Sequence, residues 1–130
     1  MVKKRILIVD DEASYTRLLK LSLVQTDRYE VEVENSSSGA LALAERFLPD
    51  LILLDVMMPG MDGGELAARL KASPKLAQVP IVFLTAAVKR EELRSREGTI
   101  GGLPFLAKPV ELAEVMQCID GILGRQPSKG

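Results

Sequence analysis

Histidine is absent from this 130-residue chain, which excludes histidine catalysis, histidine metal ligands and a phosphohistidine relay within it. The single cysteine, Cys118, excludes an internal disulfide framework and fits a reducing compartment. Long apolar runs are also lacking. Ile6–Val9 follows Lys3–Arg5 as a signal peptide would, but Asp10 interrupts it at once, and it is too short to span a membrane. We therefore expect a cytoplasmic protein.

The chain also lacks an excess of basic charge. Its net charge is −1 and the basic residues are scattered, so there is no electrostatic footprint for nucleic acid. Apolar residues make up 47% and charged residues 27% of the sequence, as in ordinary globular proteins. This length gives one domain with a real core. We expect that domain over residues 1–124, and a tail or the start of a linker over residues 125–130.

Short apolar runs alternate with helical patterns along the chain. The expected strands are Arg5–Val9, Tyr29–Glu34, Leu51–Leu54, Ile81–Leu84 and Phe105–Ala107. The expected helices are Ala13–Thr26, Gly39–Phe47, Gly63–Ala72, Lys89–Glu97 and Glu111–Leu123. In the first helix, Leu18, Leu19, Leu23 and Val24 recur at helical spacing and form the expected buried face. The alternation predicts an α/β protein with a doubly wound parallel five-stranded sheet and helices on both faces.

Polar residues stand at the ends of the predicted strands. In a sheet of this kind the functional crevice lies outside the carboxyl ends of the strands. Asp55 follows the apolar run Leu51–Leu54, where an ionised carboxylate is costly unless a cation or donors meet it. Thr85 follows the fourth strand and Lys108 the fifth. Either residue alone would be an ordinary strand-end hydroxyl or a solvated charge.

Two further carboxylates, Asp10 and Asp11, follow the first strand. Together with Glu12 they could simply cap the next helix, but two adjacent acids at a strand end exceed what capping needs. Like charges about 4 Å apart repel by about 4 kcal/mol at an effective dielectric near 20. Three carboxylates therefore require cations. Lys108 supplies one positive charge, and Mg²⁺ held by oxygen ligands suits the rest.

The same cations make Asp55 a usable nucleophile. A carboxylate is a weak nucleophile, but it can attack a phosphoryl group whose charge a metal and an ammonium neutralise. Thr85 and the backbone amide of Ala86 are placed to donate hydrogen bonds to the phosphoryl oxygens. The residues alone thus predict an aspartyl phosphate on Asp55.

In this arrangement the chain resembles the receiver domain of bacterial two-component response regulators. The resemblance rests on four motifs in order, which are Val9–Glu12, Leu54–Gly63, Leu84–Ala86 and Ala107–Pro109. It covers nearly the whole chain and implies a flavodoxin-like (βα)5 fold with strand order 2-1-3-4-5. It also implies a cis peptide bond between Lys108 and Pro109.

The resemblance assigns roles position by position. Asp55 is implied as the phosphoacceptor, and Thr85, Ala86 and Lys108 as the groups that bind the phosphoryl group. The implied Mg²⁺ ligands are Asp10, Asp11, the Asp55 carboxylate and the backbone carbonyl of Met57. Thr85 and Phe105 are implied as switch residues. Phe105 lacks the hydroxyl of the commoner tyrosine, so we expect it to point inward even before phosphorylation.

The implied function is a signalling switch rather than an enzyme acting on other molecules. A histidine kinase or a histidine phosphotransfer protein would phosphorylate Asp55. The surface of the fourth helix, fifth strand and fifth helix would then change and control an output partner or domain, with a phosphorylation-dependent homodimer as a further option. No direct contact with nucleic acid or membrane is expected. We expect slow self-dephosphorylation, because neither Met57 nor Ala87 can orient a water by hydrogen bonding.

Three alternatives share parts of this pattern. A haloacid-dehalogenase-like phosphatase also uses an aspartate nucleophile with Mg²⁺, but it places a second acid two residues later, where this chain has Met57. A flavodoxin-like FMN module shares the fold, but Asp10, Asp11 and Glu12 would repel its phosphate. A degenerate receiver that binds partners without phosphorylation would not need every motif position intact.

Overall fold

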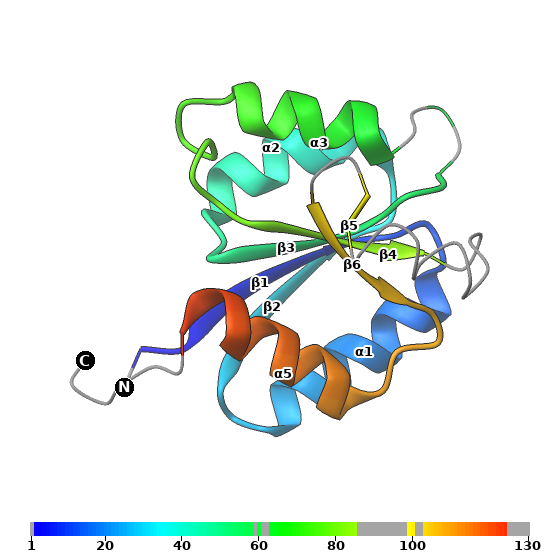
Figure 1. The fold of residues 1–130 in the computed structure, drawn as a ribbon, viewed down its shortest axis with the longest axis vertical. Helices are drawn as coiled ribbons and strands as arrows, with labels where there is room; N and C mark the ends of the chain where they lie inside the picture. The colour runs from blue at the N-terminus through cyan, green and yellow to red at the C-terminus, as the bar shows by residue number, and fades with distance from the viewer. Residues whose placement is uncertain (1, 59, 61–62, 86–98, 101–102, 125–130) are drawn as a thin grey trace.

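The computed structural model describes residues 2–58, 60, 63–85, 99–100 and 103–124 (Figure 1). The strands are β1 (Lys4–Val9), β2 (Tyr29–Glu34), β3 (Leu51–Asp55), β4 (Ile81–Thr85), β5 (Thr99–Ile100) and β6 (Leu103–Ala107). The helices are α1 (Ala13–Gln25), α2 (Ser37–Phe47), α3 (Gly63–Ala72) and α5 (Leu112–Leu123). The expected helix at Lys89–Glu97 lies outside the described residues.

The predicted parallel sheet is confirmed. The strands lie side by side in the order β2-β1-β3-β4-β6-β5, and the first five of these pair in parallel. β6 is the fifth strand of the sequence prediction, so the order 2-1-3-4-5 holds. β2, half exposed in the alternating pattern of its residues, lies at one edge.

The other edge differs from the prediction. β6 begins at Leu103, two residues before the expected start. Its residues Phe105–Ala107 pair in parallel with β4, while Leu103 and Pro104 pair antiparallel with the short strand β5. The proline thus stands near the start of the strand, where the loss of one donor does little harm. The two-residue strand β5 has no apolar alternation of its own, so the sequence pattern did not predict it.

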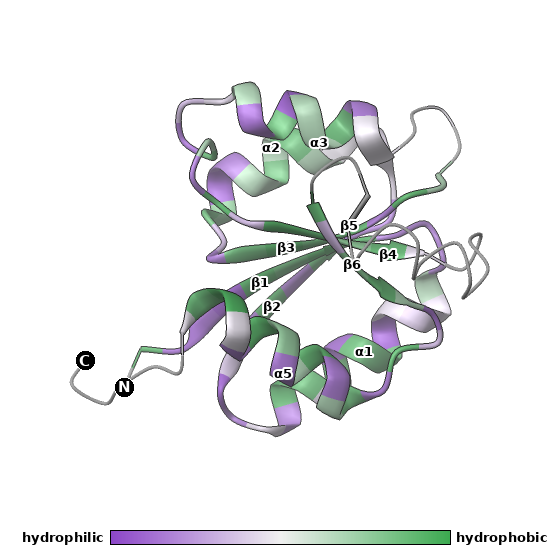
Figure 2. Cartoon of the chain, viewed as in Figure 1, coloured by the Kyte–Doolittle hydropathy of each residue, from purple (hydrophilic) through white to green (hydrophobic). Residues whose placement is uncertain are grey.

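The core is divided by the sheet, as expected for strands buried on both faces. Leu7, Ile52 and Leu54 face α2 and α3, whereas Ile8, Leu53 and Leu84 face α1 and α5. Figure 1 shows one pair of helices on each side of the sheet, and Figure 2 shows the central strands as apolar along most of their length. No helix in the described ranges is long and apolar enough to cross a membrane.

The buried face of α1 is narrower than predicted. Leu19 and Leu23 are buried as expected, but Leu18 is 66% exposed and Val24 is 41% exposed. The third buried position is a polar residue, Thr16. The spacing of apolar residues alone allowed a broader buried stripe. Thr16 was not predicted as buried because it is polar; its hydroxyl is satisfied within the helix, where it donates to the Ala13 carbonyl.

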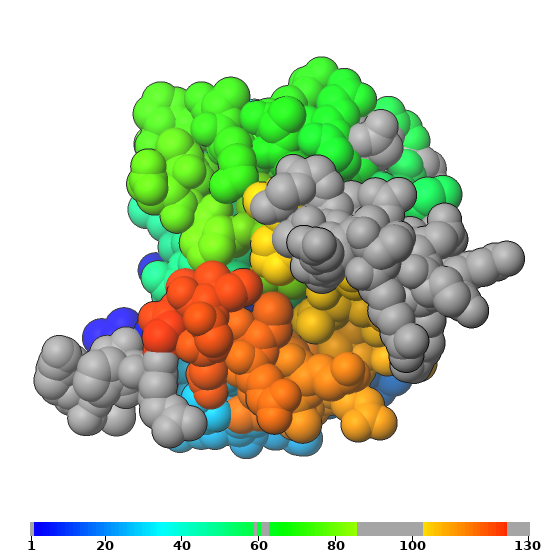
Figure 3. Space-filling view, in the orientation of Figure 1, coloured from blue at the N-terminus to red at the C-terminus, as the bar shows by residue number. Residues whose placement is uncertain are grey.

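Figure 3 shows α5 and β6 side by side on the face toward the viewer, with α3 above them. The α5 side of the sheet is closed by Val115 and Ile119, which are fully buried against the strands. The predicted start of α5 is confirmed to within one residue, because Glu111 is its N-cap and shares a capping box with Glu114. At the start of α2, the Ser36 side chain is the cap and accepts a hydrogen bond from the Gly39 amide at 3.3 Å.

Gly63 allows α3 to begin directly against the end of β3. Its amide donates to the Val56 carbonyl at 2.7 Å. A Cβ at this position would lie 2.7 Å from the Asp55 carbonyl oxygen and 2.7 Å from the Val56 Cα. Both neighbours are backbone atoms, so they cannot turn aside. Gly63 therefore fixes the approach of α3 to the segment that follows Asp55.

We expect Gly63→Ala to destabilise the fold by about 1–3 kcal/mol, because the added methyl overpacks a backbone contact. The matched control is Gly121→Ala in α5, where nothing lies within 4 Å of the added Cβ. The control should stabilise by about 0.5–1 kcal/mol, since alanine favours a helix interior. Urea unfolding of both variants measures the difference, and equal effects would contradict this packing account.

Candidate functional site

The carboxyl ends of the strands bring the predicted site residues together. Asp10 directly follows β1, Asp55 ends β3, Thr85 ends β4 and Lys108 directly follows β6. Asp10, Asp55 and Thr85 are buried, and the Lys108 side chain is only 8% exposed. The Lys108 amide donates to the Thr85 carbonyl at 2.8 Å. The lysine is therefore anchored beside β4 by its own backbone.

The Lys108 ammonium is the centre of the site. Its Nζ lies 2.6 Å from Asp10 Oδ2 and 3.7 Å from Asp55 Oδ2. It also donates to Glu12 Oε1 at 3.0 Å. On a further side the Nζ lies 5.0 Å from the centre of the Tyr15 ring, within the range of a cation–π contact. One ammonium thus meets three carboxylates.

Backbone donors hold both buried carboxylates in place. The Glu12 amide donates to Asp10 Oδ1 at 2.9 Å, and the Met57 amide donates to Asp55 Oδ1 at 3.2 Å. In each case the second oxygen of the carboxylate is the one that faces Lys108. The donor in each case is the amide two residues further along, which is the usual reach of an aspartate side chain to its own backbone.

Sequence reasoning missed three members of this surrounding structure. Asn35 donates to the Asp10 carbonyl at 2.7 Å and to Thr16 Oγ1 at 3.1 Å. It directly follows β2, so the same strand-end rule would have found it. The Glu12 side chain makes no cap hydrogen bond to α1 and contacts Lys108 instead. Tyr15 gave no signal, because its position depends on how α1 is rotated against the sheet.

Burial and charge oppose each other at Asp55. Burial raises its pKa, and the neighbouring Asp10 raises it further. The Met57 amide and Lys108 lower it, and the balance leaves the pKa at about 6. Burial alone would lower the pKa of Lys108, but its contacts with Asp10 and Glu12 outweigh burial and raise it. The lysine therefore stays charged at neutral pH.

The carboxylates fit a hard divalent cation. One oxygen each from Asp10, Asp11 and Asp55 can be chosen so that all lie within 4.8 Å of one another. Asp11 is exposed while the other two are buried, so the cluster is open to water on one side. An oxygen-only set that leaves room for waters suits Mg²⁺. With Glu12 counted, the site holds four carboxylates and one ammonium, so it carries an excess of negative charge when all are ionised.

Of the remaining predicted site residues, the structure describes Met57 and Phe105. The Met57 amide lies beside Asp55, but the Met57 side chain is 62% exposed. Phe105 is partly buried and packs against the core cluster that contains Phe83. Its role as a switch stays a prediction. Ala86 and Ala87 lie outside the described residues, and the cis Lys108–Pro109 bond is confirmed.

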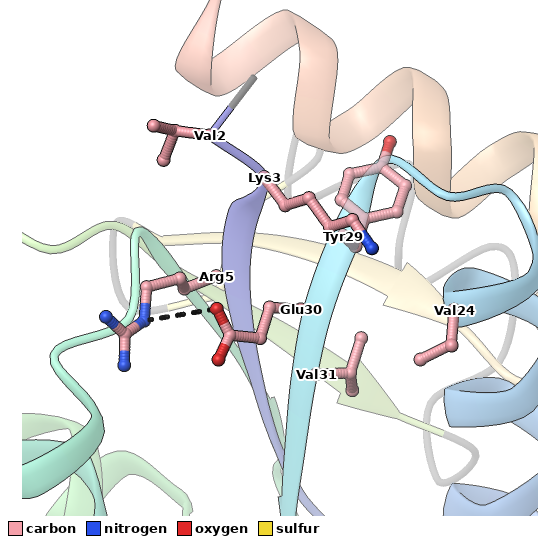
Figure 4. Close-up of a pocket in the computed structure, with 7 residues that line it drawn as sticks. All are labelled: Val2, Lys3, Arg5, Val24, Tyr29, Glu30 and Val31. Atoms are coloured by element: carbon pink, nitrogen blue, oxygen red, sulfur yellow. Dashed lines mark ion pairs between the residues drawn. The ribbon is translucent and has the colours of Figure 1, made fainter.

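A separate groove lies at the opposite end of the sheet. It is lined by residues near the starts of β1 and β2 and by one residue of α1 (Figure 4). These are Val2, Lys3, Arg5, Val24, Tyr29, Glu30 and Val31. The basic residues there are already paired, Lys3 with Asp27 and Arg5 with Glu30. The clustered chemistry is at Asp55 and not in this groove.

Comparison with known proteins agrees with the fold and the strand-end cluster. Residues 6–120 match the family model described as the response regulator receiver domain. The chain therefore belongs to the response regulator receiver domain family. The members of this family are signalling domains that act as phosphorylation-dependent switches, which confirms the class of protein expected from the motifs.

Curated relatives include both longer proteins and one of similar length. The chain is 44% identical over 108 residues to the response regulator PleD of Caulobacter vibrioides, covering 82% of this chain and 23% of PleD. It is 38% identical over 126 residues to the phosphate regulon transcriptional regulatory protein PhoB of Pseudomonas aeruginosa, covering 96% of this chain and 54% of PhoB. It is 33% identical to the polar-differentiation response regulator DivK of Brucella ovis, covering 93% and 97% of the two chains. The chain thus spans about a quarter to a half of the first curated relatives it matches.

Solved structures give the same result. A response regulator from Chloroflexus aurantiacus is 33% identical with a TM-score of 0.80, covering 95% of this chain and all of that one. The receiver domain of the sensor histidine kinase PA1611 from Pseudomonas aeruginosa is 26% identical with a TM-score of 0.79, covering 95% and 99%. That neighbour holds a magnesium ion in its active site cleft. The acidic cluster of the present chain is consistent with the same ion.

The raised pKa of Asp55 predicts how stability depends on pH in the absence of Mg²⁺. The folded pKa of about 6 lies above the ordinary value of 3.8. The contribution of this group is therefore most favourable below the ordinary value and is lost as the pH rises through 6. Asp55→Asn removes the ionisation. Relative to wild type it should gain up to about 3 kcal/mol in free energy of unfolding between about pH 4 and pH 7.5.

Urea unfolding with a chelator present measures this gain. The matched control is Asp27→Asn, which changes the same charge at a carboxylate whose side chain is 87% exposed. The control should show a much smaller dependence on pH. Added Mg²⁺ should stabilise wild type at pH 7.5 more than Asp55→Asn. A pH profile of Asp55→Asn parallel to that of wild type would contradict the cost assigned to this buried carboxylate.

Proposed function

We propose that Asp55 accepts a phosphoryl group from a partner histidine kinase or histidine phosphotransfer protein, with Mg²⁺ bound. The chain would then change the surface formed by the helix expected at Lys89–Glu97, β6 and α5 and so control a partner or output domain. The observation that carries this proposal is the position of the Lys108 ammonium, 2.6 Å from Asp10 and 3.7 Å from Asp55 at a buried strand end. A simple surface carboxylate would not be held in this way.

The transfer itself needs little from the protein beyond position and charge. One Asp55 oxygen attacks phosphorus, the new oxygen–phosphorus bond forms, and the bond from phosphorus to the donor nitrogen breaks. The electron pair of that bond stays on the donor nitrogen, and the leaving imidazole takes up a proton from water. Lys108 offsets charge on the phosphoryl oxygens, while the Met57 amide holds the other Asp55 oxygen in place. Positioning and electrostatics of this kind account for most of phosphoryl-transfer catalysis.

Asp10, Asp11, the Asp55 carboxylate and the Met57 carbonyl are the proposed Mg²⁺ ligands. When bound, the ion supplies Lewis-acid neutralisation of the phosphoryl oxygens. Asp10 is held by the Glu12 amide and its backbone by Asn35, so it can serve as a fixed support. Asp11 is exposed, so this side of the cluster is open to an ion that arrives from water.

Thr85 and Phe105 are the proposed switch. Both stand on neighbouring strands, Thr85 at the end of β4 and Phe105 on β6 opposite Phe83. A shift of Thr85 toward a phosphoryl group, aided by the Ala86 amide, would open space that Phe105 can fill. Because phenylalanine has no hydroxyl to hydrate, the inward position costs it no hydrogen bond to water.

The lengths of the relatives bear on how the signal passes to a downstream partner. PhoB is named as a transcriptional regulator and is about twice as long as the match, whereas DivK matches along nearly its whole length. The relatives therefore include proteins with a long additional segment beside this domain and proteins that consist of little else. We propose that output here passes through protein contact, including a phosphorylation-dependent homodimer, rather than through nucleic acid bound by these residues.

Phosphorylation is tested with acetyl phosphate and Mg²⁺, read by intact mass. Wild type and the Asp27→Asn control should each gain one phosphoryl group, while Asp55→Asn should gain none. Asp11→Asn should react at least about tenfold more slowly, as expected when a metal ligand is lost. An adduct that persists in Asp55→Asn would overturn the proposal. Turnover of small phosphomonoesters by wild type would instead favour the phosphatase alternative.

The phosphorylated form should lose its phosphoryl group slowly. The Met57 side chain is exposed beside the site, and a thioether cannot orient an attacking water by donating a hydrogen bond. We expect Met57→Asn, which introduces such a donor, to shorten the lifetime of the phosphorylated protein severalfold. The decay of the intact-mass adduct after donor removal measures it. A wild-type half-life of seconds would contradict this expectation.

A further inference from the structure

The Lys108 ammonium is shared unequally among three carboxylates. Its Nζ lies 2.6 Å from Asp10, 3.0 Å from Glu12 and 3.7 Å from Asp55. The Asp10 and Asp55 side chains are 0% and 6% exposed, but the Glu12 side chain is 60% exposed. The lysine is thus closer to an exposed glutamate than to the buried aspartate on which the chemistry is proposed.

Glu12 is the partner that can be exchanged. Asp10 is immobilised by the Glu12 amide on its carboxylate and by Asn35 on its backbone carbonyl. The Glu12 side chain makes no cap hydrogen bond to α1 and instead forms an ion pair with Lys108, whose ammonium donates to Glu12 Oε1. An ammonium has three N–H donors in all. The donation to Glu12 occupies one of these donors, and a phosphoryl group at Asp55 would draw on the same ammonium.

We propose that Glu12 is a positioning residue that holds Lys108 back from Asp55 in the unphosphorylated protein and competes with the incoming phosphoryl group for it. This inference rests on the proposed phosphorylation of Asp55. Tyr15 limits the alternatives, because its ring lies 5.0 Å from the Nζ on a further side. The ammonium therefore moves between Glu12 and the phosphoryl oxygens, with Asp10 as the common support.

The competition acts on donor binding more than on the chemical step. Freeing Lys108 from Glu12 helps the bound donor and the transition state alike, because both carry the phosphoryl charge. Uniform binding of this kind changes KM and leaves kcat nearly constant. Because the Glu12 side chain is 60% exposed, its ion pair with Lys108 is screened by water and is worth about 0.5–1 kcal/mol, which corresponds to a change of about two- to fivefold.

The test measures phosphorylation by acetyl phosphate with saturating Mg²⁺ across a range of donor concentrations. Glu12→Gln should lower the apparent KM by about two- to fivefold, with kcat unchanged. Glu12→Asp keeps the charge and should remain closer to wild type. The matched control is Glu32→Gln, which makes the same charge change in the middle of β2, opposite Leu7, and should leave both constants unchanged.

A double-mutant cycle with Lys108→Gln separates a contact from a general effect of charge. If Glu12 acts through Lys108, then Glu12→Gln should have no further effect once the ammonium is gone. An equal drop in KM in the Lys108→Gln background would overturn the inference, as would an unchanged KM in the single variant. If wild type is phosphorylated normally while the variants give either of these contradicting results, the proposed role of Glu12 fails and the proposed function stands. If wild type is not phosphorylated at all, both the role of Glu12 and the proposed function fail.

Discussion

The ion pair between the Lys108 ammonium and the buried carboxylate of Asp10 is the constraint on which the site depends. Both groups are almost fully removed from water, and a buried charge that loses its partner costs several kcal/mol. The same ammonium reaches Asp55 at 3.7 Å, so the residue proposed to react is held by the pair rather than by water. The excess negative charge that remains explains why the site suits a divalent cation, whose charge would in turn offset that of a phosphoryl group.

The parallel sheet brings Asp10 and Lys108 together from distant parts of the chain. β1 and β6 are separated by β3 and β4, yet their carboxyl ends converge because all four strands run in parallel. Leucine, isoleucine and valine on both faces fix that alignment, since a slip of one residue would exchange the residues facing the two helix layers. Gly63 then lets α3 start against the segment after Asp55. The packing of the core therefore determines the geometry of the site in this fold.

Much of this could be predicted from the sequence, because strand periodicity and strand-end chemistry are local signals. The parallel sheet and the convergence of Asp10, Asp55 and Lys108 followed from them, whereas the strand order and the family followed from the resemblance of the motifs. Other features depend on tertiary placement. The exposure of Leu18 reflects how α1 is rotated, and the contact from Glu12 to Lys108 joins residues 96 positions apart. No short-range pattern records either of these.

The most direct measurement traps the proposed acyl phosphate where it forms. After reaction with acetyl phosphate and Mg²⁺, borohydride reduces an aspartyl phosphate to homoserine, and peptide mass mapping locates the change. The account predicts homoserine at position 55 alone, formed only when Mg²⁺ is present. Homoserine at position 10 or 11, or a trapped product that forms equally well in the presence of a chelator, would contradict it.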